Sequence, residues 1–153
     1  MRRKDRETTR EEALIILDRS SWGVLSMADK AGDPYCVPLS IVRDGEWLYF
    51  HCALEGHKLE LLHVKPKVCI AFTGNVEFPE DNFTAVYESA IVFGTAEEVT
   101  TEKEKLHGLR IISERFTPGN MHAFEEEANK MLSRTGVWKI HIDEITGKRR
   151  KLP

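Results

Sequence analysis

The sequence lacks several features that identify common classes of protein. It has only three cysteines, Cys36, Cys52 and Cys69, which form neither an even disulfide set nor a CxxC pair, and each lies in an apolar segment. No apolar run approaches the ~20 residues of a membrane span, and no apolar stretch follows the charges of the N-terminus. We therefore expect reduced thiols, no membrane association and a cytoplasmic protein.

No single sign of charge dominates either. The chain has 22 Lys and Arg against 25 Asp and Glu, a net charge of -3. This balance gives no long-range attraction for nucleic acid, and we expect no such partner. Basic residues gather only near the two ends, at 2–6 and 148–151, where solvated tails are the simpler interpretation. A GxGxxG element is missing, so a nicotinamide dinucleotide is not expected as a resident cofactor.

What is present is an ordinary globular composition, with 41% hydrophobic and 31% charged residues. At 153 residues, folding buries about two-thirds of the unfolded surface, enough for one domain with its own core. No repeat or low-complexity segment divides the chain. We expect a single domain over residues 1–153.

The first third of the chain predicts a helix followed by a three-stranded meander. Thr8 and Thr9 are each followed three residues later by glutamate, the pattern of a reciprocal helix cap. Asp44-Gly45 favours a type I′ hairpin turn, which needs two positive φ angles. The strands expected from β-branched, aromatic and alternating residues are 22–28, 35–42 and 47–52.

The remainder predicts helices alternating with three more strands. A short helix at 56–64 ends before Pro66, Gly94 indicates a bulge or close packing, and Thr101 with Glu104 caps a further helix. Pro118-Gly119 breaks that helix. The other expected elements are strands at 68–73, 89–99 and 136–145, a polar loop at 74–85 and an amphipathic helix at 121–132. Six short strands with flanking helices indicate a mainly β fold, an antiparallel barrel or α+β roll.

The segment from His51 to Lys58 has the pattern of an anion site. It runs from a strand end through a loop into the start of a helix, where the first N–H groups have no internal partner. Gly56 lets a ligand approach the backbone, and Lys58 adds a positive charge. A lysine that is merely solvated is the alternative interpretation.

Several short motifs are spread over most of the chain, and each alone is common. They are WGVLS at 22–26, PYCVPLS at 34–40, LYFHCA at 48–53, GHKL at 56–59, KPKVC at 65–69, YES and VFG within 87–94, and ITGKR at 145–149. Their order and spacing together resemble the nitroimidazole-reductase (Nim) type of the pyridoxamine 5'-phosphate oxidase-like superfamily. The resemblance implies a six-stranded antiparallel split β-barrel with flanking helices that binds FMN, with FAD or haem less favoured.

The same resemblance implies where the flavin binds. The loop and helix start hold its phosphate, and the strand containing Pro38 lies along the ring. Pro38 cannot donate a ladder hydrogen bond, so an edge, a bulge or a ligand-facing position is expected, unless it merely ends strand pairing. The implied cofactor-binding residues are Val37, Pro38, Leu39, Ser40, His51, Cys52, Ala53, Gly56, His57, Lys58 and Trp138.

His51 is the candidate catalytic residue. In Nim-type proteins a histidine at the matching strand end is proposed to handle a nitro substrate, and an imidazole can donate a hydrogen bond or a proton there. The alternative interpretation is a structural histidine at the strand end that forms hydrogen bonds with backbone groups. The resemblance also implies a homodimer with flavins at the interface, to which Trp138 contributes from the partner subunit, whereas a tryptophan in an alternating apolar row is also typical of a core.

Other chemistry fits the sequence poorly. His51, His57 and His63 recur every six residues, which matches no common metal-ligand spacing, and no metal is expected. Neighbouring Cys52 and His51 face opposite ways on a strand, which prevents a direct dyad. Pyridoxamine phosphate oxidases pair an arginine with the phosphate-loop lysine, where this chain has His57. Their substrate-phosphate motifs are absent, and residues 150–153 match their C-terminus only in a different register, which disfavours vitamin B6 oxidation.

Three hypotheses of function therefore stand. The first is an FMN-dependent reductase that takes electrons from a transiently bound nicotinamide or another donor and passes them to a small nitroaromatic or quinone-like acceptor. The second is a non-enzymatic flavin or haem binding protein that acts in storage, sensing or protection. The third, a deazaflavin-dependent enzyme, calls for more basic residues around a longer acidic cofactor tail.

Overall fold

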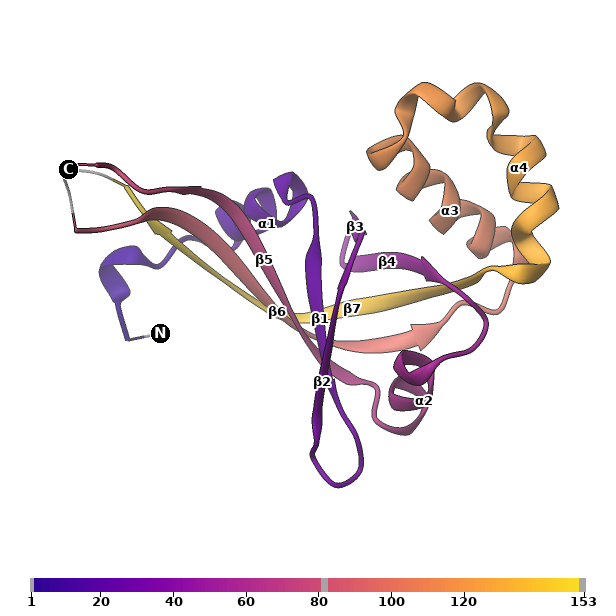
Figure 1. Cartoon of the computed structure of the whole chain (residues 1–153), viewed down its shortest axis with the longest axis horizontal. Coiled ribbons are helices and arrows are strands. Elements are labelled where there is room, and N and C mark those ends of the chain that lie inside the picture. The colour runs from indigo at the N-terminus through magenta and orange to yellow at the C-terminus, as the bar shows by residue number, and fades with distance from the viewer. Residues whose placement is uncertain (1, 81–82, 152–153) are drawn as a thin grey trace.

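The computed structural model describes residues 2–80 and 83–151, and its strands form one open antiparallel sheet (Figure 1). The sheet has seven strands in the order β2-β1-β5-β6-β7-β4-β3, with every neighbouring pair antiparallel. The expected mainly β split-barrel architecture is confirmed. The strands are β1 (Gly23–Ala28), β2 (Pro34–Leu39), β3 (Val42–Asp44), β4 (Trp47–Cys52), β5 (Lys67–Glu77), β6 (Val86–Glu98) and β7 (Gly136–Arg150).

The number of strands differs from the expected six because the segment expected as one strand at 35–42 is interrupted. Ser40 and Ile41 leave the strand geometry, and the Ile41 side chain turns into the core, where it is 5% exposed. The meander prediction is therefore wrong. The two halves of this segment instead form separate hairpins, β1–β2 and β3–β4, whose outer strands lie at opposite edges of the sheet.

The hairpin expected at Asp44-Gly45 is present, but its turn type is not the expected one. Asp44 pairs with Trp47 across a two-residue connection. Gly45 has a φ of 59°, whereas no residue other than glycine in the described ranges has a positive φ. A type I′ turn needs positive φ at both central positions, so that prediction is wrong and the glycine alone provides the reversal.

Strands β5 and β6 extend beyond their expected ends into a long hairpin. β5 continues to Glu77, so residues 74–77 of the expected loop are strand, while residues 81–82 of that loop lie outside the described residues. The expected irregularity at Gly94 is confirmed, because the register with β7 shifts between Phe93 and Gly94. A Cβ at Gly94 would lie 2.4 Å from the carbonyl oxygen of His141, so only glycine allows this approach.

Helix α1 covers one face of the sheet and begins at a full capping box. The Glu12 N–H donates to Thr9 Oγ1 (3.2 Å), and the Thr9 N–H donates to Glu12 Oε2 (3.1 Å), so Thr9 rather than Thr8 is the cap. The helices are α1 (Arg10–Arg19), α2 (His57–Val64), α3 (Glu102–Phe116) and α4 (Phe124–Met131), with 3-10 helices η1 (Lys4–Arg6), η2 (Pro118–Ala123) and η3 (Leu132–Arg134).

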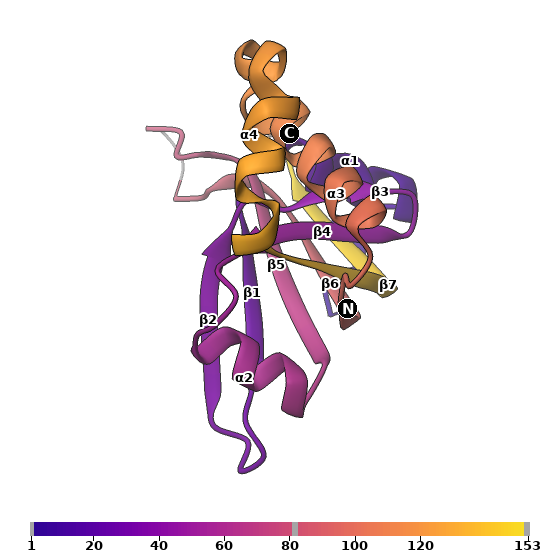
Figure 2. The ribbon, with the colours of Figure 1, turned by 90° about the vertical axis from the view of Figure 1, so that its right-hand side faces the viewer.

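Helices α2, α3 and α4 frame the two sides of β4. Figure 2 shows α2 on one side of this strand and α3 with α4 on the other. The main core holds Leu48 and Phe50, whereas Tyr49 belongs to a second cluster beneath α3 with Ile112 and Val137. The helix expected at 121–132 begins at Phe124, after η2, and packs mainly against α3 and the 3-10 helices. No helix of the described chain is long and apolar enough to cross a membrane.

Candidate functional site

The end of β4 and the start of α2 meet at one end of the sheet, as the sequence predicted. The Lys58 Nζ atom lies 5.6 Å from the centroid of the Phe50 ring. The His57 ring meets the Tyr35 ring edge-on, with centroids 5.0 Å apart, which brings β2 against the helix start. The end of β4, the start of α2 and the edge strand β2 therefore converge around residues 56–58.

The start of α2 has the features of an anion site. Gly56 has a φ of 131° and ψ of 162°, a conformation that side-chain-bearing residues rarely adopt. Its carbonyl oxygen accepts from the N–H groups of Leu59 (2.8 Å) and Glu60 (3.3 Å), and within the described structure the His57 and Lys58 N–H groups have no acceptor. Lys58 also forms no ion pair there. Two N–H groups and one ammonium group are available to a ligand.

The charge of Lys58 reaches both residues at the end of β4. Burial lowers the pKa of His51, and Lys58 lowers it further. Burial raises the pKa of the Cys52 thiol, Lys58 opposes that shift, and Glu98 adds to it. At neutral pH the structure therefore holds a neutral imidazole beside a protonated thiol.

His51 and Cys52 face opposite sides of β4, which confirms that they form no direct dyad. The His51 side chain lies beneath α3 and α4, whereas Cys52 packs against the main core. Among the residues that the structure describes, no group of three or more His, Cys, Asp and Glu side chains could hold a metal ion.

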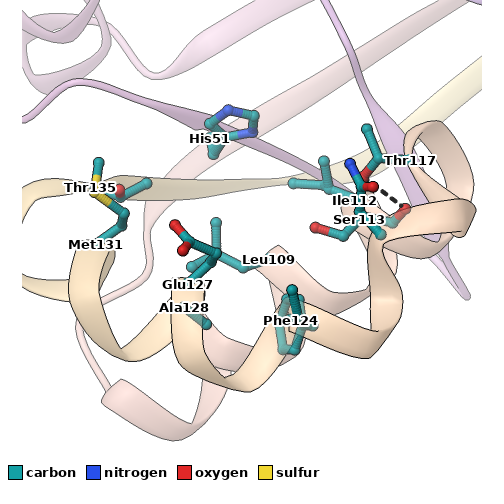
Figure 3. Close-up of a pocket in the computed structure, with 12 residues that line it drawn as sticks. His51, Leu109, Ile112, Ser113, Thr117, Phe124, Glu127, Ala128, Met131 and Thr135 are labelled. Carbon is teal, nitrogen blue, oxygen red and sulfur yellow. Dashed lines mark hydrogen bonds between the residues drawn. The ribbon is translucent and has the colours of Figure 1, made fainter.

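His51 opens onto a cavity of about 500 Å³ between β4 and the helices α3, η2 and α4 (Figure 3). Apolar side chains from α3 and α4, including Leu109, Ile112 and Phe124, form its walls. The sequence prediction missed these residues. Their signal was the apolar stripe of two amphipathic helices, which does not by itself distinguish a core-facing stripe from one that lines a cavity.

The strand expected to lie along the flavin ring is β2, an edge strand, so the structure gives Pro38 the first of the three positions expected for it. Val37 and Leu39 pack against the main core, whereas Pro38 faces outward opposite Val24. Ser40 follows the end of β2. An edge strand leaves half of its backbone hydrogen-bonding groups outside the ladder, so they are available to a ligand.

Trp138 lies in the main core of the chain, 2% exposed and paired in register with Phe50. Its ring meets that of His63 at a centroid distance of 5.1 Å, and its Nε1 is buried without a partner among the described residues. Ala53 is exposed just after β4. The expected contact of Trp138 with a flavin stays a prediction.

Solved structures from several bacteria share this fold. A candidate 5-nitroimidazole antibiotic resistance protein from Bacteroides thetaiotaomicron is 27% identical, with a TM-score of 0.79 over 92% of this chain and 83% of that one. A flavocytochrome from Azotobacter vinelandii is 25% identical, with a TM-score of 0.74 over 95% of this chain and 69% of the other. A conserved hypothetical protein from Mycobacterium tuberculosis, 17% identical with a TM-score of 0.82 over 99% and 92% of the two chains, shows the fold alone.

Comparison with known sequences gives fewer matches than comparison with solved structures. A search of curated protein sequences found no significant match. The family model described as pyridoxamine 5'-phosphate oxidase matches residues 9–149, which include α1, β1 to β6, all but the last residue of β7 and the site at the end of β4. The chain therefore belongs to the pyridoxamine 5'-phosphate oxidase family.

Proposed function

We propose that this chain binds FMN at the end of β4 and the start of α2, and that it passes electrons from a reduced nicotinamide or another donor to a small nitroaromatic or quinone-like acceptor. One observation carries the proposal: the available N–H groups and ammonium of Lys58 lie beside His51, which opens onto an apolar cavity. Family membership and the likeness to the Bacteroides protein support it.

The helix start suits the phosphate of FMN. A dianionic phosphate needs several donors, and His57 and Lys58 offer two backbone N–H groups at the positive end of a helix dipole. Gly56 has no side chain, and nothing lies within 4 Å of where its Cβ would stand, so the approach is open. Bound there, FMN would supply reversible hydride and electron transfer.

His51 would act on the acceptor. Its lowered pKa keeps the imidazole neutral at neutral pH, so one ring nitrogen carries a proton to donate and the other accepts. From the floor of the cavity, the ring would donate a hydrogen bond or a proton to a nitro or quinone oxygen as negative charge develops on it.

A second copy of the chain would complete the site. The outer face of the sheet carries a row of small and apolar residues in register across four strands, namely Pro38, Val24, Ala71 and Ile91. Phe93 adds a side chain that is 47% exposed on the same face. Such a face is typical of an oligomer interface. We propose a homodimer through it, with the flavin between the subunits.

Vitamin B6 oxidation is not proposed, because His57 stands where the oxidases carry an arginine. A flavin or haem binding protein without turnover is the second candidate. It is favoured by the likeness to the flavocytochrome and by the neutral imidazole of His51, which is a possible haem ligand.

Spectroscopy of the purified protein tests these alternatives. Flavin absorption bands that bleach when NADH is added without oxygen are expected for the reductase. Bands that stay oxidised with every donor, or a haem Soret band, would favour the binding protein. A colourless protein that takes up no FMN would contradict the whole proposal.

Two substitutions test the individual roles. Lys58→Ala is expected to lower the flavin content of the purified protein, and Lys65→Ala, at the other end of α2, serves as the control. His51→Ala is expected to keep flavin but lose turnover of a nitroaromatic acceptor. Unchanged flavin in the first variant, or full turnover in the second, would remove that residue from the site.

A further inference from the structure

The cavity beneath α3 and α4 has an unusual charge distribution. Of the described residues that line it, only His51 and Glu127 have titratable side chains. The rest are apolar, such as Ile112 and Phe124, or neutral and polar, such as Thr117. Because His51 is neutral at neutral pH, the Glu127 carboxylate is the single formal charge on the described lining.

Glu127 is placed to act on whatever occupies the cavity. It extends from α4 on the side that faces His51 (Figure 3). Its one ion-pair partner in the described structure is Lys130 on the same helix, at 3.2 Å, and Lys130 lies closer to Glu126, at 2.7 Å. Exposed pairs within one helix are weak, so a ligand competes for this carboxylate at little cost.

The other properties of the cavity restrict the shape of the ligand. A volume of about 500 Å³ suits a small organic molecule. The walls formed by Ile112 and Phe124 favour an apolar, flat group, which packs beside the Phe124 ring because the Arg110 guanidinium already lies over that ring, 4.5 Å from its centroid. A ligand that extends from Glu127 to His51 needs one end that suits a carboxylate and another that accepts a hydrogen bond.

We propose that this cavity selects small aromatic compounds that carry a protonated nitrogen, with the ring against Ile112 and Phe124 and the nitrogen at Glu127. The acceptor end of the molecule then faces His51. This inference rests on the proposed function, because it makes the cavity the acceptor site of the flavin enzyme. It adds a class of ligand and a residue that determines specificity.

Equilibrium binding to the oxidised protein tests the proposal without any turnover. Three nitroaromatic compounds of similar shape differ in charge at pH 7: 4-nitrobenzylamine is cationic, 4-nitrobenzyl alcohol is neutral and 4-nitrobenzoate is anionic. Isothermal titration calorimetry is expected to give the amine about fivefold tighter binding than the alcohol, the size of one exposed ion pair. The benzoate is expected to bind more weakly than the alcohol. Equal binding of all three, or no binding, would overturn the proposal.

Two variants of α4 assign the effect to its residue. Glu127→Gln is expected to remove the preference for the amine and to leave the affinity for the alcohol unchanged. Glu126→Gln makes the same change of charge on the same helix and beside the same lysine, but outside the cavity, so it should keep the preference. An equal loss in both variants, or in neither, would contradict the role of Glu127.

Flavin content, measured on the same samples, separates this proposal from the function on which it rests. A flavoprotein that reduces acceptors without a preference for the amine would refute the cavity proposal alone. A protein that prefers the amine but takes up no FMN would refute the flavin function and leave the charge selectivity standing as a property of the cavity.

Discussion

Helices α1 and α3 begin with the same Thr-x-x-Glu pattern, yet the two glutamates have different roles. At α1, Glu12 closes the capping box on Thr9. At α3, the Glu104 N–H donates to Thr101 Oγ1 (3.3 Å), but the Glu104 carboxylate accepts instead from Lys139 Nζ (2.8 Å) and the Tyr49 hydroxyl (3.3 Å). Both carboxylates bond to β7, because Glu12 Oε1 also accepts from Arg149 (2.9 Å), but only the Glu12 carboxylate closes the cap of its own helix.

The buried side chains of the two regions also differ in what they contact. Ala13 and Ile16 of α1 are fully buried against the sheet. In the region of α3 and α4, Ile112 and Phe124 are also buried, but they also line the cavity. One helix therefore stabilises the fold, whereas the others enclose a space. The comparison teaches that a shared local pattern does not fix what a helix contributes.

The largest effect that we expect comes from Gly147, where α1 crosses β7. A Cβ there would lie 2.7 Å from the Ala13 Cβ and 3.1 Å from its Cα, and this backbone contact cannot yield easily. Gly147→Ala should lower the free energy of unfolding by about 3 kcal/mol in urea denaturation.

Gly108→Ala, on α3, is the matched substitution. Its Cβ would lie 2.9 Å from Val137 Cγ1, a side-chain atom, and alanine is favoured over glycine in a helix by up to about 1 kcal/mol. The net change should stay within about 1 kcal/mol. Equal losses of stability in both variants would show that α1 and α3 are packed equally tightly, which would contradict the difference inferred between them.

Glu104→Gln should have an intermediate effect. Lys139 lowers the pKa of Glu104, so the stability from this carboxylate is present above its ordinary value of 4.5 and is lost as the pH falls through the folded-state pKa. At pH 7 we expect the substitution to lower the free energy of unfolding by about 1 kcal/mol, after allowance for solvent screening. This difference from the parent protein should shrink below pH 4.5.

The free energy of unfolding, measured from about pH 3 to about pH 8, checks this dependence because the carboxylate titrates within that range. Glu102→Gln, in the first turn of the same helix, is the control, because Glu102 makes no ion pair or side-chain hydrogen bond with the described residues. A loss that is independent of pH would show that Glu104 acts by packing rather than by charge.

The smallest effect concerns the floor of the cavity. Burial and then Lys58 lower the pKa of His51. Lys58→Met removes the second cause, so the pKa of His51 should rise but remain below its ordinary 6.5. NMR titration of the ring protons measures it, with Lys65→Met as the control. An unchanged pKa of His51 would show that the charge at the start of α2 does not influence the cavity.

Local signals predicted the parts of the fold that depend on nearby residues. The cap at Thr101, the end of α2 before Pro66 and the irregularity at Gly94 follow from steric and hydrogen-bonding preferences that act within a few residues. The interruption at Ser40 and Ile41 has no such signal. Ile41 suits a strand, and only the space in the core of the folded sheet turns its side chain inward.

Some residues of the candidate site could likewise be predicted from local sequence, and others could not. His51 and residues 56–58 are close in sequence, so their convergence at a strand end and helix start could be predicted from the pattern. Glu127 is 76 residues beyond His51 and lies on a helix whose apolar stripe would suit an ordinary core. Only the attachment of α3 over β4 turns that stripe toward His51 and creates the cavity.

By itself, the sequence determined the strand-rich architecture, the caps and the position of the candidate anion site, because each depends on backbone preferences and contacts over short stretches of chain. The tertiary structure alone decided that β2 and β3 occupy opposite edges, that Trp138 is buried in the core and that His51 faces a cavity with one carboxylate. These outcomes depend on how distant segments compete for the same core space, which no local pattern encodes.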